Sequence, residues 1–358
     1  MPKLRFGKGG QPLTDSNLLL VITVSIFAAM YIISMIAFGG GFLNPQQFLN
    51  LFNENASLIV LACGLSIVMV TAGIDISVGG VTALVTVCCA VHLQGQGGNV
   101  PASLILALAI GVAFGLIQGL LVAYLDVQPF IITLAGMFLA RGAATMVEVN
   151  PITVTHAGFA ALRKIEIRIP GIGYYAKNGN FINSKIELGV IIALIVLIAV
   201  FAMFKWTRFG RNLYAIGGNS QSALMLGINI KRTKFFAYLL CGGLAGLGGF
   251  IYLLHTGSGA VTQATGTEMK AIAASIIGGF LLSGGVGNIL GTLFGVISLV
   301  TINNIVVSMG LKGPWWQGIT TGAMLCFFIV LQSIIMSRRN GGKAVRPIWM
   351  RKSREIGS

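Results

Sequence analysis

The sequence predicts an all-α fold, a polytopic bundle of about ten membrane-spanning helices. Three observations lead to this prediction. Of the 358 residues, 55% are hydrophobic and only 9% are charged, against about 25% charged residues in a soluble globular chain. The apolar runs continue for about 20 residues, the length that a helix needs to cross a bilayer, without the alternation of a β-barrel strand. The 49 glycines lie mostly inside these runs, as glycines do where membrane helices pack closely.

The first predicted span, 18–38, follows basic residues but is longer than the apolar region of a signal peptide. It lacks a convincing cleavage site with small residues, so we expect it to be retained. The other nine predicted spans are 52–72, 77–93, 101–125, 129–148, 187–204, 235–254, a short 268–282, 286–309 and 315–336. Asp75 and Glu268 stand at the starts of the third and eighth spans, which leads to the hypothesis that spans two to five and seven to ten form an inverted repeat.

Small residues at four-residue spacing mark the faces where predicted spans pack together. Gly111, Gly115 and Gly119 share one face of the fourth span, and Gly242 and Gly246 share one face of the seventh. Such faces let two helix backbones approach closely in lipid. We therefore expect them to hold the bundle together.

Charge predicts which parts of the chain face the cytoplasm. The formal net charge is +15, and 16 of the 24 basic residues lie in three stretches, 3–8, 205–234 and 338–354. Basic flanks mark the cytoplasmic side of a membrane protein, and an even number of spans places both termini there. We therefore predict a cytoplasmic tail (1–17), a transmembrane domain (18–336) and a basic cytoplasmic tail (337–358). Within the domain, the loop 205–234 should be cytoplasmic and the insert 149–186 should lie outside.

The sequence argues against several other classes of protein. No extramembrane segment is long enough to form a nucleic-acid surface. There is no phosphate loop GxxxxGK[ST], no HExxH and no GxSxG, and all five cysteines lie in apolar spans. We therefore expect neither catalysis nor a bound metal or cofactor on this chain. Only nine residues are acidic, which weakens an ion-coupled mechanism but leaves it open.

The segment 72–80, AGIDISVGG, interrupts the apolar sequence between two predicted spans. Asp75 can accept the free N–H groups at the start of the following helix, and Gly79 and its neighbouring glycines permit a tight reversal. Two interpretations remain open: a helix cap in a tight turn, or a gate that includes Ser77 and the later Glu268.

The segment 217–229, GGNSQSALMLGIN, carries no charge although basic residues flank it on both sides. Asn219 or Ser220 can cap a short helix, the residues 223–226 supply an apolar face, and Gly227 can end the helix. A short apolar helix in a cytoplasmic loop needs a protein partner. We expect it to dock by inserting into a groove, with Ser222, Ala223 and Leu226 facing the partner.

Four blocks of the sequence resemble one family across nearly the whole chain: the membrane permeases of sugar-type ATP-binding cassette importers, in the ribose, xylose and galactose group. The chain is most similar to permeases of galactofuranose-type importers. The blocks are GIDISVGG (73–80), QPFIITLAGMFLARG (128–142), RFGRNLYAIGGNSQSALMLGI (208–228) and EMKAIAASIIGGFLLSGGVGNILGTLFG (268–295). The chain departs from the family at Ser222, where alanine is common, and at Ala72, where glycine is common.

The resemblance implies a function in translocation. It implies that this chain moves a monosaccharide across the bacterial cytoplasmic (inner) membrane, while ATP and Mg²⁺ bind a separate ATP-binding subunit. The other implied partners are a sugar-binding protein and a second, unlike permease. The segment 218–228 would form the coupling helix on the ATP-binding subunit, through Gly218, Asn219, Ser222, Ala223, Leu226 and Gly227. The alternative is an ion-coupled or passive transporter that works without an ATPase.

Polar residues inside apolar spans are candidates for the path of the solute. Asn53 and Asn55 stand near the start of the second span, and Thr301, Asn304 and Ser308 share one face of the ninth. Membrane bundles also use such residues for hydrogen bonds between helices, and we favour this structural interpretation over a role in the path. The sequence does not identify the sugar.

Overall fold

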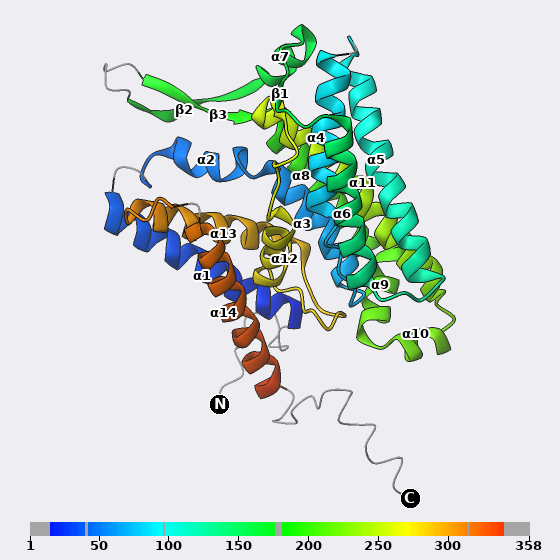
Figure 1. The fold of residues 1–358 in the computed structure, drawn as a ribbon. Helices are drawn as coiled ribbons and strands as arrows, with labels where there is room; N and C mark the ends of the chain where they lie inside the picture. The colour runs from blue at the N-terminus through cyan, green and yellow to red at the C-terminus, as the bar shows by residue number, and fades with distance from the viewer. Residues whose placement is uncertain (1–14, 40–41, 96, 176–180, 314, 340–358) are drawn as a thin grey trace, which may run out of the picture.

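The computed structural model describes residues 15–39, 42–95, 97–175, 181–313 and 315–339 (Figure 1). Both predicted tails lie almost wholly outside these residues. A helix is present at each of the ten predicted spans: α1 (Asp15–Phe38), α3 (Ala56–Met69), α4 (Val78–Gln94), α5 (Val100–Ala123), α6 (Pro129–Val147), α8 (Leu188–Trp206), α11 (Ile230–Thr256), α12 (Thr267–Ile277), α13 (Ile289–Ser308) and α14 (Trp315–Arg339). The polytopic helical fold is thereby confirmed.

The number of complete spans stays a prediction. Seven described helices are long and apolar enough to cross a membrane, and α2 (Pro45–Asn53) with α3, bent by 50° at their junction, would make an eighth. By contrast, α4 has 17 residues and α12 has 11, against the roughly 20 residues that cross the hydrocarbon layer. These two helices therefore reach only part of the way or depend on the segments that flank them.

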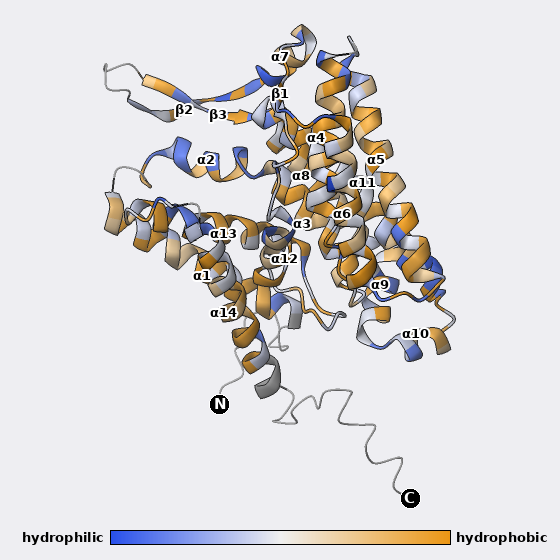
Figure 2. Ribbon diagram, viewed as in Figure 1, coloured by the Kyte–Doolittle hydropathy of each residue, from blue (hydrophilic) through white to orange (hydrophobic). Residues whose placement is uncertain are grey.

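The outer helices present apolar side chains to their surroundings. Figure 2 shows mostly hydrophobic residues along α1, α5, α6 and α14, and on α6 Phe138 and Leu139 are exposed. In contrast, every residue of α3 is buried. This distribution is the one expected when the outside of a bundle contacts lipid and a few central helices contact only protein.

Glycine faces hold the centre of the bundle together. The helices α5 and α11 pack along their length, and a Cβ at Gly111 would overlap the carbonyl oxygen of Gly242. A Cβ at Gly242 would in turn overlap the carbonyl oxygen of Gly111. The predicted packing role of these small residues is confirmed.

The arrangement of neighbours supports the hypothesis of an inverted repeat. The helix α4 packs against α5 and α6, and α12 packs in the same way against α13 and α14. Likewise, α11 packs on α4 as α3 packs on α12. The repeat itself stays a hypothesis that these pairings favour.

The predicted insert 149–186 folds into small elements of its own. It contains β1 (Ile152–Thr153), α7 (Ala157–Arg163) and most of an antiparallel hairpin of β2 (Glu166–Tyr175) and β3 (Phe181–Glu187). The strand β1 pairs with β4 (Ser258–Gly259). In the hairpin, Lys185 Nζ lies 2.6 Å from Glu166 Oε1. The hairpin and α7 lie at one end of the bundle, which we call the insert end (Figure 1).

Two further helices lie at the opposite end of the bundle. They are α9 (Arg208–Gly218) and α10 (Ser220–Met225), within the predicted loop 205–234. Figure 1 shows them at the far end from the hairpin. The predicted topology requires the loop 205–234 and the insert to lie at opposite ends in this way. We call the end that carries α9 and α10 the α10 end. Which end faces the cytoplasm stays a prediction.

Candidate functional site

The helix α10 presents an apolar surface at its end of the bundle. Asn219 caps the helix, because its side-chain Oδ1 accepts a hydrogen bond from the Ser222 N–H at 3.0 Å. Leu224, Met225 and Leu226 are 63%, 89% and 78% exposed. The chain then turns at Gly227, which has a φ of +78°. The predicted cap, apolar stretch and terminating glycine are all present, although the contact with a partner stays a prediction.

The orientation of α10 corrects one residue of the predicted coupling surface. Ala223 is only 1% exposed, so its methyl group packs within this chain and does not face outward. Gly218, Asn219, Ser222, Leu226 and Gly227 are exposed as expected. Leu224 and Met225 take the outward place that we expected for Ala223. A six-residue helix is too short for its apolar pattern to reveal which side faces the bundle.

The neighbouring helix α9 connects this surface to the bundle. The side-chain oxygen of Thr207 accepts from the Gly210 N–H at 3.0 Å and so caps α9, and Leu213 and Ile216 are buried. The Tyr214 hydroxyl donates to the Gly287 carbonyl at 2.9 Å. Burial raises the pKa of Tyr214 to about 12, so the phenol stays a neutral hydrogen-bond donor at physiological pH.

The end of α9 meets two irregular segments at a junction of glycines. The Gly285 N–H donates to the Val70 carbonyl at 2.9 Å, which joins the segment after α3 to the segment after α12. A Cβ at Gly217 would overlap this same carbonyl oxygen and the Gly285 nitrogen. Three backbones therefore meet here: α9, the segment 70–77 and the segment 278–288. We call this contact the glycine junction.

The segment 70–77 leads from the glycine junction to the buried Asp75. The Asp75 Oδ1 accepts a hydrogen bond from the Ser77 N–H at 2.9 Å and another from the Ser77 hydroxyl at 2.6 Å. Gln118 Oε1 lies 3.2 Å from the same hydroxyl. Among the described residues, Asp75 Oδ2 and Gln118 Nε2 have no hydrogen-bond partner. The hydrogen bonds to Ser77 fit the interpretation as a helix cap in a tight turn. The other carboxylate oxygen of Asp75 is buried without a hydrogen bond from any described residue, which costs free energy, and such a group fits the interpretation as part of a gate.

Gly79 and Glu268, far apart in sequence, meet inside the bundle. A Cβ at Gly79 would overlap the Glu268 carboxylate. Glu268 Oε2 lies 3.8 Å from Arg141 Nη2, and the guanidinium also donates to the Val261 and Ala264 carbonyls, at 3.3 Å each. The structure thus brings two predicted gate residues together. We did not single out Arg141, although a charge within an apolar span is itself a signal of function.

The predicted path residues lie in separate places. The Asn53 side chain bonds the backbone of β3: its Nδ2 donates to Lys185 O at 3.1 Å and its Oδ1 accepts from Glu187 N at 3.0 Å. The Thr301 hydroxyl donates to Ile297 O within its own helix. Asn304 and Ser308 line one cavity of about 350 Å³, while Asn55 lines another. A role in the path stays a prediction for all five, and the bonds of Asn53 and Thr301 favour the structural interpretation.

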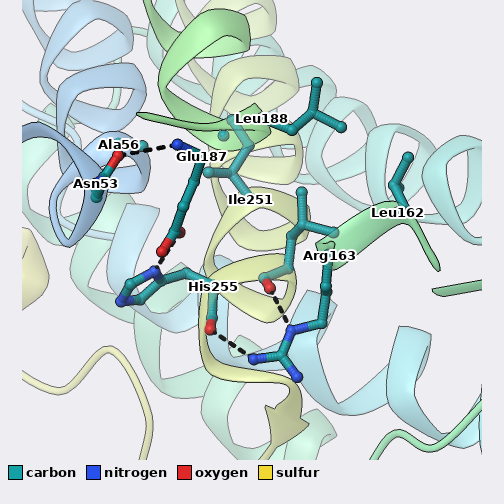
Figure 3. A pocket seen from close by; sticks show the side chains of 10 residues that line it. Asn53, Ala56, Leu162, Arg163, Glu187, Leu188, Ile251 and His255 are labelled. Carbon is teal, nitrogen blue, oxygen red and sulfur yellow. Dashed lines mark hydrogen bonds and ion pairs between the residues drawn. The ribbon is translucent and has the colours of Figure 1, made fainter. Parts of the chain in front are cut away.

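A polar cluster at the insert end joins α2, α7, β3 and α11, through Asn53, Arg163, Glu187 and His255 (Figure 3). His255 Nδ1 lies 2.7 Å from Glu187 Oε2. Arg163 donates to the carbonyls of Leu254 at 2.8 Å and His255 at 3.0 Å, which caps the end of α11. The enclosed volume is about 10 Å³, space for about one water molecule. This cluster fastens the insert to the bundle and has no room for a sugar.

Within the described ranges, no group of three or more His, Cys, Asp or Glu side chains is placed to hold a metal ion. The candidate functional site is built from an exposed apolar surface and from close backbone and side-chain contacts. It consists of the α10 surface, the glycine junction and the contacts of Asp75, Gly79 and Glu268 beyond it.

Comparison with known proteins covers most of the chain. Residues 47–329 match the family described as branched-chain amino acid transport system / permease component. The inner membrane ABC transporter permease protein YjfF of Escherichia coli K12 is 37% identical over 316 residues, which are 88% of this chain and 92% of that protein. The fructose import permease protein FruG of Bifidobacterium longum is 34% identical over 338 residues, 94% of this chain and 96% of FruG.

The ribose import permease protein RbsC of Escherichia coli K12 is 33% identical over 310 residues, 86% of this chain and 92% of RbsC. No solved structure matches. These relatives confirm the resemblance to permeases of sugar-type importers that the four sequence blocks indicated. Because the family match extends from α2 into α14, this chain belongs to the family of branched-chain amino acid transport system permease components.

Proposed function

We propose that this chain is the membrane-spanning permease of an ATP-driven monosaccharide importer of the bacterial inner membrane. Relatives that cover most of the chain are named as import permeases for fructose and ribose. The sequence has no phosphate loop, so in an ATP-driven importer the ATP would be hydrolysed on another chain. The exposed apolar surface of α10, at the end of the bundle where the basic flanks lie, is the observation on which this proposal depends.

The α10 surface is where an ATP-binding subunit would dock, with ATP and Mg²⁺ on that subunit. Leu224, Met225 and Leu226 would insert into a groove of the partner, since three neighbouring exposed apolar side chains in an extramembrane helix are otherwise in contact with water. Movement of the partner would pass through α9 to the glycine junction. From there it would reach Asp75, Ser77 and Gly79 at the start of α4 and, through the contact of Gly79, Glu268 at the start of α12.

The remaining partners and the orientation follow from the same arrangement. The α10 end and both termini would face the cytoplasm, because basic residues concentrate there. The insert end would face outward and receive the sugar-binding protein. A second permease, unlike this one, would complete the translocation path. Each of these placements is part of the proposal.

A single substitution tests the docking surface. Leu226→Glu places a carboxylate where the partner would bury an apolar side chain, at a cost of several kcal/mol unless the helix undocks. We expect this chain to express and insert normally while the ATP-binding subunit no longer co-purifies. Ile165→Glu is the matched control, because Ile165 is also exposed but lies between α7 and β2 at the insert end. Normal assembly and transport by Leu226→Glu would place the coupling contact elsewhere.

A further inference from the structure

A polar cavity of about 420 Å³ lies where α3 and α12 begin, and it opens to the surface of the described chain, where Glu54, Thr262 and Thr265 are exposed. Nine of its eleven lining residues have polar side chains. They come from the break between α2 and α3, from α11, from the irregular segment 260–266 and from the start of α12. Cavities of about 300–1,000 Å³ are typical of small-molecule sites, so its size suits one small solute.

The cavity adjoins the predicted membrane span α6. Its wall includes Ala264, whose carbonyl accepts from Arg141 on α6. Arg141 stands between the middle and the end of the 19-residue span α6, about 9 Å along the helix from its last residue. Non-helical backbone at this depth is tolerated only where it is buried in protein or lines a water-filled cavity. The irregular segment 260–266 lines this cavity, so its backbone stands in a place where non-helical structure is tolerated.

The backbone of this segment is held in an unfavourable conformation. Ala264 has a φ of +54°, in the left-handed region that residues with a Cβ seldom adopt. Arg141 fixes the Val261 and Ala264 carbonyls, and the Glu268 Oε1 accepts from the Gly266 N–H at 3.3 Å. Such conformations persist where the surrounding structure enforces them, and they concentrate at ligand sites. Arg141 and Glu268 are thus positioning residues for the cavity wall.

Several polar groups on the wall are available to a ligand. Asn55 uses its Nδ2 to donate to Leu51 O at 3.1 Å, which leaves its Oδ1 as an acceptor. The Tyr252 hydroxyl and the exposed Glu54 carboxylate also line the cavity. Thr265 donates to the Thr262 carbonyl, and its oxygen can still accept. Donors and acceptors therefore surround the space.

The charge of the wall favours a neutral ligand. Glu54 and Lys270 are its only charged lining residues in the described chain, and their charges sum to zero. An ion of either sign would meet one repelling group as well as one attracting group. Tyr252 adds an aromatic ring, which can pack against the apolar face of a sugar ring. A neutral ligand with many hydroxyl groups satisfies these features together.

We propose that this cavity binds a neutral monosaccharide of pentose or hexose size during translocation, with Asn55, Tyr252, Thr265 and Glu54 as the hydrogen-bonding groups. This inference rests on the proposed function and adds the place and the chemistry of the solute site. Of the predicted path residues, Asn55 belongs to this site. The cavity at Asn304 and Ser308 offers fewer free groups, because the Ser308 hydroxyl donates to the Asn304 carbonyl at 2.7 Å.

The test uses the assembled complex, with its ATP-binding subunit, second permease and sugar-binding protein, in sealed vesicles. The probes are radiolabelled D-ribose, D-fructose and D-galactose, each offered separately. Tyr252→Phe removes one hydroxyl and keeps the ring, and we expect it to slow uptake about 2- to 10-fold, the effect of one lost hydrogen bond. Thr265→Trp fills the cavity, and we expect it to abolish uptake.

Thr145→Trp is the matched control, because Thr145 is an exposed threonine on α6 outside the cavity. It should transport like the wild type. Wild-type uptake by both Tyr252→Phe and Thr265→Trp would overturn the site and leave the proposed function intact. Loss of a partner subunit from the Thr265→Trp complex would also overturn it, since the cavity would then be an assembly surface. If the wild-type complex transports none of the three sugars, the proposed function fails and the site fails with it.

Discussion

Gly79 on α4 leaves room for the carboxylate of Glu268 on α12. A Cβ at this position would overlap the Glu268 carboxylate, whereas a Cβ at Gly142 on α6 would meet nothing within 4 Å. We expect Gly79→Ala to lower the free energy of unfolding by about 1–3 kcal/mol through overpacking. In Gly142→Ala, the methyl group should be neutral or stabilising, because alanine favours helix. Thermal unfolding of the two purified variants in detergent measures the difference, and equal melting temperatures would contradict the close contact.

Contacts within a short stretch of sequence could be predicted, and long-range contacts could not. Asn219 caps α10 and Asp75 bonds Ser77 two residues later, because both interactions depend on local spacing. The meeting of Gly79, Glu268 and Arg141 depends on which helices pack together. No spacing rule reveals that, although the charge of Arg141 inside a predicted span was a usable signal.

At the scale of elements, α9 links the proposed docking surface to the breaks after α3 and α12. Gly217→Ala adds a methyl group that would overlap the Val70 carbonyl oxygen, so it should separate α9 from the glycine junction. Coupling free energies of 1–3 kcal/mol correspond to about 5- to 150-fold effects. We therefore expect sugar uptake per ATP hydrolysed to fall about 10-fold while the ATP-binding subunit still co-purifies.

The matched control adds the same methyl group one residue later. A Cβ at Gly218 meets nothing within 4 Å, so Gly218→Ala should not lower the melting temperature of the isolated chain, whereas Gly217→Ala should. An unchanged ratio of uptake to hydrolysis in the Gly217→Ala complex would show that α9 does not transmit movement through this junction.

Element positions were more predictable than element orientation. Each predicted span coincides with a helix because runs of apolar residues define membrane helices directly. The prediction that Ala223 faces outward from α10 was wrong, since Ala223 is buried and Leu224 and Met225 are exposed. The hairpin β2–β3 was also not predicted, because its alternation is short and interrupted by an irregularity between Ile169 and Gly173.

At the scale of the whole molecule, the hydrophobic composition predicted a polytopic helical bundle, and the positions of the basic residues predicted which parts of the chain face the cytoplasm. The number of spans depends on features that hydropathy does not measure: the 50° bend between α2 and α3 and the partial length of α4 and α12. The first residues of α3 and α12 line the polar cavity, and the segments after these two helices meet at the glycine junction. Discontinuous helices are a common source of solute sites in transporters, so the least regular parts of the bundle are those that we connect with transport.

The most direct measurement compares sugar uptake by the assembled complex with uptake by this chain alone. Both preparations are sealed into vesicles, supplied with ATP and Mg²⁺, and tested with radiolabelled D-ribose, D-fructose and D-galactose. We expect uptake of at least one sugar by the complex, dependent on ATP, and none by the chain alone, because the chain has no phosphate loop and gains its energy only through a docked subunit. Uptake of these sugars by the chain alone, in a preparation shown to contain no ATP-binding subunit, would contradict this mechanism and indicate a passive or ion-coupled transporter.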